Sequence, residues 1–415
     1  MTPFGKAWLA ICVVSLIAAL PPRDSAALPP RGSVASPPKD PVASPIRDTA
    51  EGQSDRYRTR MRLQMGSFTE ITVPAADYTH RAVSRAFDAV EALDRLLSTY
   101  RPESEVSRLA AAGRLAVSPE VLEITALAIR MARATGGAFN PALGPVIQLW
   151  RDAEARQAPP SPAELARARR STDYERVLLQ TEPDIIAFAE PGMALNFGAI
   201  GKGYALDKAA EVLLAEGIDS AMLASGGSSH RLLGHPLERP CWEMAIRHPE
   251  APDRLVAFLL VGAGGMATSA QSGKQRVIQG RTYGHIIDAR TGRPADPETP
   301  IWSATVWAPD AATADALATA LIVMEAARGL ELIETRAESE ALIVRRAPDG
   351  SPFLQSTSGI VRRGELDDLP LYVLVQETRC LGDSGAGDSS RLVGSPIARL
   401  GQNLRSGRPA SDPPS

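Results

Sequence analysis

The stretch TADALATALIVM, Thr313 to Met324, carries the clearest structural signal in the chain. It is apolar around its whole circumference, which is typical of a helix that is buried on all sides. Asp315 and Thr319 interrupt it four residues apart, and residues at this spacing lie on one helical face. Two interpretations stay open. Asp315 is either favoured by the helix dipole near the start of the helix, beside a tolerated Thr, or the two form a pair of oxygen ligands for a hard cation.

Composition and the N-terminus bound the class of protein. The chain has 415 residues, of which 45 are basic and 48 acidic, and this near-neutral balance gives no reason to expect a nucleic-acid or polyanion partner. One Lys and then an apolar run from Ala7 to Leu20 open the chain. The run is shorter than the roughly 20 residues of a membrane span and is typical of a signal peptide. We expect a signal peptide or a retained anchor over residues 1–27, and export to the periplasm or tethering on the extracytoplasmic side of the membrane.

Both ends differ from the middle of the chain. Residues 28–56 are rich in proline, and residues 377–415 are poor in apolar side chains, so we expect a disordered linker and a disordered tail. The folded domain is expected over residues 57–376. Outside the signal segment the cysteines are Cys241 and Cys380, and a disulfide between them is possible in an oxidising compartment. The sequence has no Cys-x-x-Cys pattern, so it indicates neither redox nor thiolate-zinc chemistry.

Strand and helix patterns follow one another without regular β-α-β alternation, which favours an α+β domain with mixed or antiparallel sheets. Alternation and β-branched residues predict a strand over residues 63–75, and apolar residues at helical spacing predict a helix over 77–100. Helices are also expected from Ser118, where Pro follows the cap, and from Ser161, which opens a capping box. A further helix is expected at 201–217, and further strands at 184–190, 193–197, 220–227, 254–262, 275–280, 283–288, 303–309 and 340–346.

A glycine-rich loop, NFGAIGKGYALD, runs from Asn196 to Asp207 between a predicted strand and a predicted helix. Glycine lets the backbone approach a ligand closely, and a helix N-terminus suits a phosphate. The loop is not a Walker motif, because Gly203 follows Lys202 where Ser or Thr is needed, and its glycine spacing is not that of a dinucleotide fingerprint. A phosphate site and an ordinary strand-to-helix turn both stay open. SGGSS, Ser225 to Ser229, has the same character.

Two further segments contain candidate functional side chains. In TYGHIIDARTGRPA, from residue 282 to 295, His285 is expected on a strand, where it is either a general base or a structural residue. Asp288 and Arg290 are expected to pair across the turn that follows. In GGAFNPALGPVIQLW, from residue 136 to 150, Phe139 and Asn140 either hold a ring system or fill the core.

Taken in order, eight motifs resemble those of the ApbE family, whose members are FAD:protein FMN transferases. The resemblance runs from about Met65 to about Val344. The motifs are MGSFTEITV, LLSTYRPESEVSRL, TGGAFNPALGP, LNFGAIGKGYALDKAAEVL, SGGSS, TSAQSGKQRV, GHIIDARTGRPA and ATVWAPDAATADALATAL.

The resemblance implies a compact α+β domain with FAD in a cleft. It also implies Mg²⁺-dependent transfer of FMN from FAD to a Thr or Ser hydroxyl of an acceptor flavoprotein, with release of AMP. By position it implies FAD contacts at Met65, Tyr100, Ala138, Phe139, Asn140, Lys202 and Ile287. It implies a metal site at Ala199, Asp315 and Thr319, with His285 as the base. The chain departs from the family pattern at Asn140, where Asp is usual, at Ala270 in place of the Gly of TSG, and at Ala289 in place of Pro.

Other functions stay possible on these residues. Water in place of the acceptor hydroxyl would make the protein a pyrophosphatase that converts FAD to FMN and AMP. A non-enzymatic FAD-binding protein is a second alternative, and the Asp315 and Thr319 pair argues against it, because storage needs no catalytic metal. A tethered module without a ligand would leave the ordered glycine loops unexplained. The sequence does not identify the acceptor protein.

Overall fold

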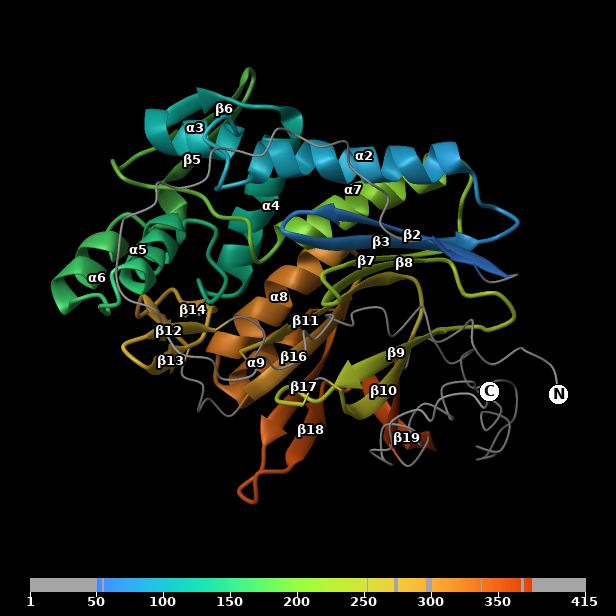
Figure 1. Ribbon diagram of the computed structural model, residues 1–415. Coiled ribbons are helices and arrows are strands. Elements are labelled where there is room, and N and C mark those ends of the chain that lie inside the picture. Colours follow the sequence, from blue (N-terminus) through green and yellow to red (C-terminus); the bar gives the residue numbers. More distant parts are fainter. Residues whose placement is uncertain are drawn as a thin grey trace, which may run out of the picture.

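A nine-stranded antiparallel sheet is the centre of the computed structural model, which describes residues 51–53, 56–251, 253–271, 275–295, 301–336, 338–366 and 369–374 (Figure 1). Each hydrogen-bonded pair of neighbouring strands in this sheet is antiparallel. In spatial order the strands are β1 (Glu51–Gln53), β2 (Tyr57–Gln64), β3 (Ser67–Pro74), β7 (Ala221–Ser225), β8 (Ser229–Leu233), β11 (Gly264–Ala270), β16 (Ile301–Ala308), β17 (Glu340–Arg346) and β18 (Pro352–Ser356).

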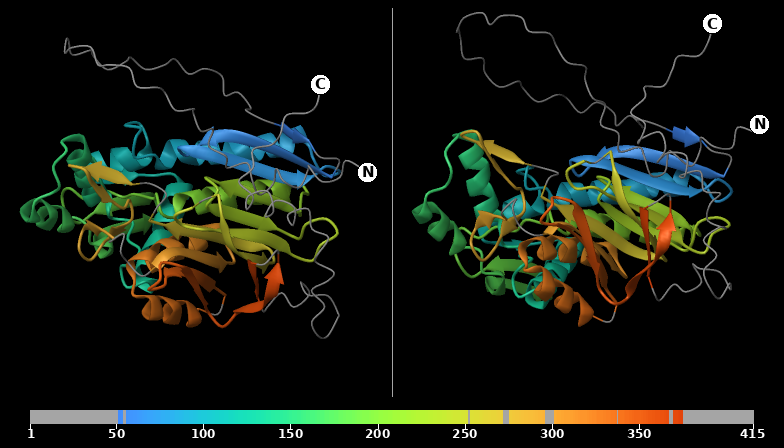
Figure 2. Two further views of the ribbon diagram at one scale, coloured as in Figure 1. Left: turned by 60° about the horizontal axis from the view of Figure 1, so that its bottom comes forward. Right: turned by 90° about the horizontal axis from the view of Figure 1, so that it is seen from below.

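Helices cover one face of this sheet and enclose the main hydrophobic core (Figures 1 and 2). Helix α8 (Ala311–Val323) lies directly on β11 and β16, α7 (Gly201–Ala215) packs on α8, and α2 (His80–Leu97) packs on α7. Helix α4 (Pro119–Ala134) also contacts α8. The remaining described helices are α3 (Glu105–Ala112), α5 (Gly144–Ala155), α6 (Pro162–Arg169), α9 (Ala326–Glu334) and the short 3-10 helix η1 (Tyr174–Arg176).

A four-stranded sheet packs on the other face and encloses a second core that includes Trp242, Trp302 and Trp307. Its order is β19 (Ile360–Leu366), β20 (Leu369–Leu374), β10 (Leu255–Val261) and β9 (Trp242–Arg247), with β10 and β20 parallel. Smaller sheets complete the fold, which confirms the predicted α+β class. They are formed by β4 (Arg114–Ala116), β6 (Asp184–Phe188) and β5 (Val177–Thr181), by β12 (Arg276–Ile278) and β13 (Arg281–Tyr283), and by β14 (Ile287–Asp288) and β15 (Arg293–Pro294).

Helix α8 is buried on all sides, as its composition predicts, and Thr319 is its one partly exposed residue. The helix begins at Ala311, two residues before the predicted start, because the Asp310 side chain accepts a hydrogen bond from the Thr313 N–H at 2.7 Å. Asp315 is therefore the fifth helical residue, beyond the first turn to which the dipole effect is largely confined. The interpretation of Asp315 as a residue placed by the dipole is wrong.

Three expected strands are not formed as predicted, and that at 283–288 is described with the cavity below. Residues 63–75 form a hairpin rather than one strand, because Met65 and Gly66 take φ values of 52° and 70° and turn the chain between β2 and β3. Residues 193–197 are irregular, since the backbone there bonds to the start of α5 and to the loop before it instead of to a strand. The Ala194 carbonyl accepts from Gly144 N, and Asn196 N donates to the Pro141 carbonyl.

Several predictions concern residues outside the described ranges. These are the segment 1–27, residues 28–50, the tail 377–415 and Cys380. Within the predicted linker, residues 51–53 pair with β2 as strand β1. Cys241 is buried and disulfide-bonded, and its pairing with Cys380 stays a prediction. Among the helices that the structure describes, none combines the length and the apolar character that crossing a membrane requires.

The close contact of α7 with α8 predicts different effects for alanine substitutions at two nearby glycines. A Cβ on Gly203 would lie 2.1 Å from the Ala311 carbonyl oxygen, whereas a Cβ on Gly201 would meet its nearest atom, in Phe197, at 3.4 Å. We expect Gly203→Ala to lower the free energy of unfolding by about 1–3 kcal/mol through overpacking. Gly201→Ala should be neutral or stabilise by at most about 1 kcal/mol. Urea denaturation measures both variants, and equal effects would contradict the packing described.

Glu70 provides a pH-dependent test of the sheet. It lies on β3 between Met61 and Ala224 of the neighbouring strands, and burial raises its pKa from 4.5 to about 7. A raised carboxyl pKa means that the folded state prefers the protonated form, so stability present below pH 4.5 is lost as the pH rises through 7. Glu70→Gln should match the wild type at about pH 4 and exceed its free energy of unfolding at about pH 8, by at most about 3 kcal/mol.

Denaturation curves across this pH range make the comparison. Glu103→Gln is the matched control, because the Glu103 side chain is 71% exposed. A constant difference between the wild type and Glu70→Gln at all pH values would rule out the proposed effect of Glu70.

Candidate active site

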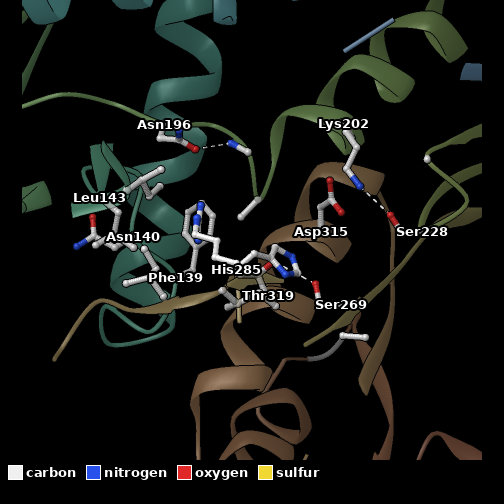
Figure 3. Close-up of a pocket in the computed structure, with 18 of the residues that line it drawn as sticks. Phe139, Asn140, Leu143, Asn196, Lys202, Ser228, Ser269, His285, Asp315 and Thr319 are labelled. Carbon is white, nitrogen blue, oxygen red and sulfur yellow. Dashed lines mark hydrogen bonds between the residues drawn. The ribbon is translucent and has the colours of Figure 1, made fainter. Parts of the chain in front are cut away.

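A cavity of about 640 Å³ lies between the start of α7, helix α8, and the loop that leads from α4 to α5 (Figure 3). Segments far apart in the sequence form its wall, including both predicted glycine loops and the segment that contains His285. Nine of the eleven predicted site residues line this cavity: Ala138, Phe139, Asn140, Ala199, Lys202, His285, Ile287, Asp315 and Thr319.

Asp315 and Thr319 present oxygen atoms to the cavity from one face of α8. The Asp315 side chain is fixed, because Oδ2 accepts from the Gly203 N–H at 3.0 Å and Oδ1 accepts from Ser229 Oγ at 2.8 Å. Thr319 Oγ1 lies 3.2 Å from Ser269 Oγ. A carboxylate has about four acceptor positions, so Asp315 keeps capacity for a further partner. This geometry favours the interpretation of the pair as oxygen ligands.

The two glycine loops meet at the start of α7. Lys202 Nζ donates a hydrogen bond to Ser228 Oγ at 2.7 Å, so the ammonium group of one loop is held by the other (Figure 3). Ile200 is the N-cap of α7, and Gly198 and Ala199 before it line the cavity. An ammonium group beside a helix N-terminus suits a phosphate. The N–H groups of Ile200 and Gly201 both donate to the Phe197 carbonyl, as in an ordinary turn, so both interpretations stay open.

His285 reaches the cavity beside Thr319 (Figure 3). It lies in a bend between β13 and β14, not on a strand as expected. Strand β14 is only two residues long because the chain turns directly after it, where Gly292 takes a φ of 70°. The expected pair stabilises this turn: Arg290 Nε and Nη2 each lie 2.9 Å from an oxygen of Asp288.

Phe139 and Asn140 have structural contacts as well as a place in the cavity wall. Phe139 is 2% exposed and belongs to the main core, so it fills the core and also borders the cavity. Asn140 Nδ2 donates to the Thr172 carbonyl at 2.9 Å, and Oδ1 accepts from Ala142 N at 2.8 Å. An Asp at this position has no donor for Thr172. The amide therefore gives Asn140 a bond to the Thr172 carbonyl that a carboxylate at this position would not form.

Two predicted FAD contacts do not line the cavity. Met65 is in the β2–β3 turn. Its Cε lies 3.6 Å from the point that a Cβ would occupy if Gly201 had a side chain. Tyr100 is 79% exposed. Its ring stacks on the Arg151 guanidinium at 4.4 Å, and its hydroxyl accepts from Arg151 Nη2 at 2.8 Å. Tyr100 does not line the cavity itself, but it contacts Arg151, which does.

Sequence reasoning missed a group of charged residues at the α5 end of the cavity. Arg151 and Glu154 come from α5, and Arg276 comes from β12. Arg276 Nε lies 3.4 Å from Glu154 Oε2, and burial lowers the pKa of Arg276. The only sequence signal was the spacing of Arg151 and Glu154, three residues apart and hence on one helical face. Helix α5 itself was not predicted, and nothing in the sequence links it to β12.

The charges of the cavity wall suit a polyanionic ligand with a cation. Among the described residues that line it, Lys202, Arg151 and Arg276 have cationic side chains, and Asp315 and Glu154 have carboxylates. Within the described ranges, no group of three or more His, Cys, Asp or Glu side chains is placed to hold a metal ion. Mg²⁺ that is bound together with phosphates usually has one or two carboxylate ligands.

Comparisons with known proteins show which family the chain resembles. The ApbE family model matches residues 65–343. The FAD:protein FMN transferase of Treponema pallidum is 30% identical over 329 residues, which are 74% of this chain and 89% of that protein. The enzyme of the same name from Vibrio cholerae is 32% identical over 275 residues, 65% of this chain and 80% of that protein.

Solved structures give the same result. The ApbE protein of Thermotoga maritima superposes with a TM-score of 0.65 at 25% identity, covering 73% of this chain and 97% of that one. The flavin transferase ApbE of Vibrio cholerae gives a TM-score of 0.64 at 28% identity, with the same two coverages. On its sequence and its fold, this chain belongs to the ApbE family.

Proposed function

We propose that this protein is an FAD:protein FMN transferase, which moves the FMN part of FAD onto a Thr or Ser hydroxyl of an acceptor flavoprotein. The observation that carries this proposal is the cavity in which Asp315 and Thr319 lie with Lys202 and His285. The names of the relatives support it, since those proteins are FAD:protein FMN transferases.

The proposed reaction breaks the phosphoanhydride bond of the FAD diphosphate and forms a phosphoester bond to the acceptor. The acceptor hydroxyl oxygen attacks the phosphorus on the FMN side of the FAD diphosphate, and the bond from that phosphorus to the bridging oxygen breaks. AMP leaves with that oxygen and its electron pair, and His285 takes the hydroxyl proton. Lys202 and the positive end of the α7 dipole would hold the diphosphate. Such a transfer needs mainly positioning and neutralisation of charge.

The residues present fit Mg²⁺ as the metal of this site. The main-chain oxygen of Ala199, the Asp315 carboxylate and the Thr319 hydroxyl would bind it, and these hard oxygen donors are the kind that Mg²⁺ prefers. When bound, Mg²⁺ would neutralise charge on the phosphates. Ser229 and the Gly203 N–H hold the Asp315 carboxylate in place for this role.

We also propose that the protein acts outside the cytoplasm, after export directed by residues 1–27. The apolar run from Ala7 to Leu20 supports this proposal. The proline-rich residues 28–50 would then separate the domain from the membrane if the segment is retained, and the acceptor would be an exported flavoprotein.

A direct test incubates the exported form with FAD, Mg²⁺ and a Thr-containing acceptor flavoprotein, and measures the acceptor by intact-mass spectrometry. We expect the acceptor to gain the mass of FMN with release of AMP. Asp315→Asn should lower the rate at least about 100-fold, because it removes a ligand charge from a metal that contributes several kcal/mol.

Asp310→Asn is the matched control, since Asp310 caps the same helix but does not line the cavity. Free FMN and AMP without any labelled acceptor would show a pyrophosphatase instead. Tight FAD binding without turnover would show a flavin-binding protein.

A further inference from the structure

Helices α7 and α8 are joined at a buried junction around Asp207, a residue outside the cavity wall. We propose that Asp207 is a positioning residue. It holds the start of α8 against α7, and so keeps the Asp315 carboxylate where a divalent cation binds. This inference rests on the proposed function, because it concerns the metal affinity of the same site.

The carboxylate of Asp207 bridges the two helices. It belongs to α7, yet Oδ1 accepts from the Ala311 N–H and Oδ2 from the Ala312 N–H, each at 2.9 Å. The first N–H groups of a helix have no partner within it. Two of these groups in α8 are therefore satisfied by a side chain of its neighbour, which fixes where α8 begins relative to α7.

Arg231 of β8 completes the junction. Its Nε lies 3.2 Å from Asp207 Oδ1, and its Nη1 donates to the Pro309 carbonyl at 3.1 Å, just before α8. The side chains of Arg231 and Asp207 are only 20% and 15% exposed. Burial and, to a smaller extent, the Asp310 carboxylate raise the pKa of Asp207 to about 7, while the two N–H donors and Arg231 lower it. Burial thus disfavours the charged form of this carboxylate, and three donors stabilise it.

The junction leads directly to the proposed metal ligand. Gly203 lies four residues before Asp207, so both face α8 from the same side of α7. Its missing side chain lets α7 approach the Ala311 carbonyl, and its N–H donates to Asp315 Oδ2 at 3.0 Å. One turn of α7 therefore contacts α8 at two places, at Ala311, which is the first residue of α8, and at Asp315. A shift of α8 at Asp207 would move the Asp315 carboxylate away from the Gly203 N–H.

Asp310 provides a close comparison within the same helix start. Its carboxylate accepts from the N–H and the hydroxyl of Thr313, at 2.7 and 2.9 Å, so it caps α8 from within. Asp207 and Asp310 both accept hydrogen bonds from N–H groups at the start of α8. The bonds of Asp310 are within the start of α8, whereas those of Asp207 connect α8 to α7. If Asp207 acts only as a cap, the two residues should have the same effect on the site.

The test measures Mn²⁺ binding by electron paramagnetic resonance, with FAD present, for the wild type, Asp207→Asn and Asp310→Asn. The amide introduced by Asp207→Asn would turn an NH₂ group toward one of the two backbone N–H donors, so the junction opens. We expect the dissociation constant for Mn²⁺ to rise about 10–100-fold in Asp207→Asn, the range for residues that orient metal ligands, and less than about two-fold in Asp310→Asn. Thermal unfolding of both variants is measured as a control, so that a general loss of stability can be distinguished from a change in metal affinity.

Arg231→Gln gives an independent variant if Asp207→Asn does not fold, and a rise in the Mn²⁺ dissociation constant is expected there too. Equal Mn²⁺ affinity in Asp207→Asn and the wild type, equal effects of Asp207→Asn and Asp310→Asn, or an unchanged affinity in Arg231→Gln would each overturn the role of Asp207. Asp315→Asn distinguishes a failure of the role proposed for Asp207 from a failure of the proposed function. If it binds Mn²⁺ as tightly as the wild type, the metal assignment itself is wrong, and the inference fails with it.

Discussion

Helix α8 crosses α7 so closely that no side chain fits between Gly203 and the Ala311 carbonyl. The rest of the site depends on this contact. It lets a backbone N–H of α7 bond to Asp315, and it brings the start of α7, with Lys202, to the same cavity. Because α8 is buried between the sheet and α7, its polar side chains must either find partners or face the cavity. Asp315 does both, and Thr319 lies on the cavity side.

The cavity wall combines two kinds of surface. One end has the oxygen atoms of α8, the ammonium group of Lys202 and His285, whereas the α5 end has Arg151, Glu154 and Arg276. Many of these groups are held by neighbours, as in the Lys202 bond to Ser228 and the stacking of Tyr100 on Arg151. Positioning of this kind is what phosphoryl transfer chiefly requires of a protein.

The α+β class, helix α8 and most cavity-lining segments could be predicted, because local patterns and the order of motifs determine them. What the sequence could not reveal depends on contacts between distant segments. Arg276 forms an ion pair with Glu154, which is more than a hundred residues away in the sequence. Tyr100 is exposed beside the cavity and is not part of its wall. Local conformation also misled: the turn at Met65 and the bend at His285 interrupt patterns that read as continuous strands. The roles of the individual site residues stay predictions.

The central claim is that Asp315 and Thr319 form the metal site at which the FAD diphosphate reacts. Crystals grown with FAD and Mn²⁺ test it through the anomalous signal of the metal. The account predicts a Mn²⁺ peak within about 2.5 Å of the Asp315 carboxylate and the Thr319 hydroxyl, with a phosphate oxygen of FAD as a further ligand. A Mn²⁺ peak elsewhere, with FAD bound and these two side chains unliganded, would contradict it.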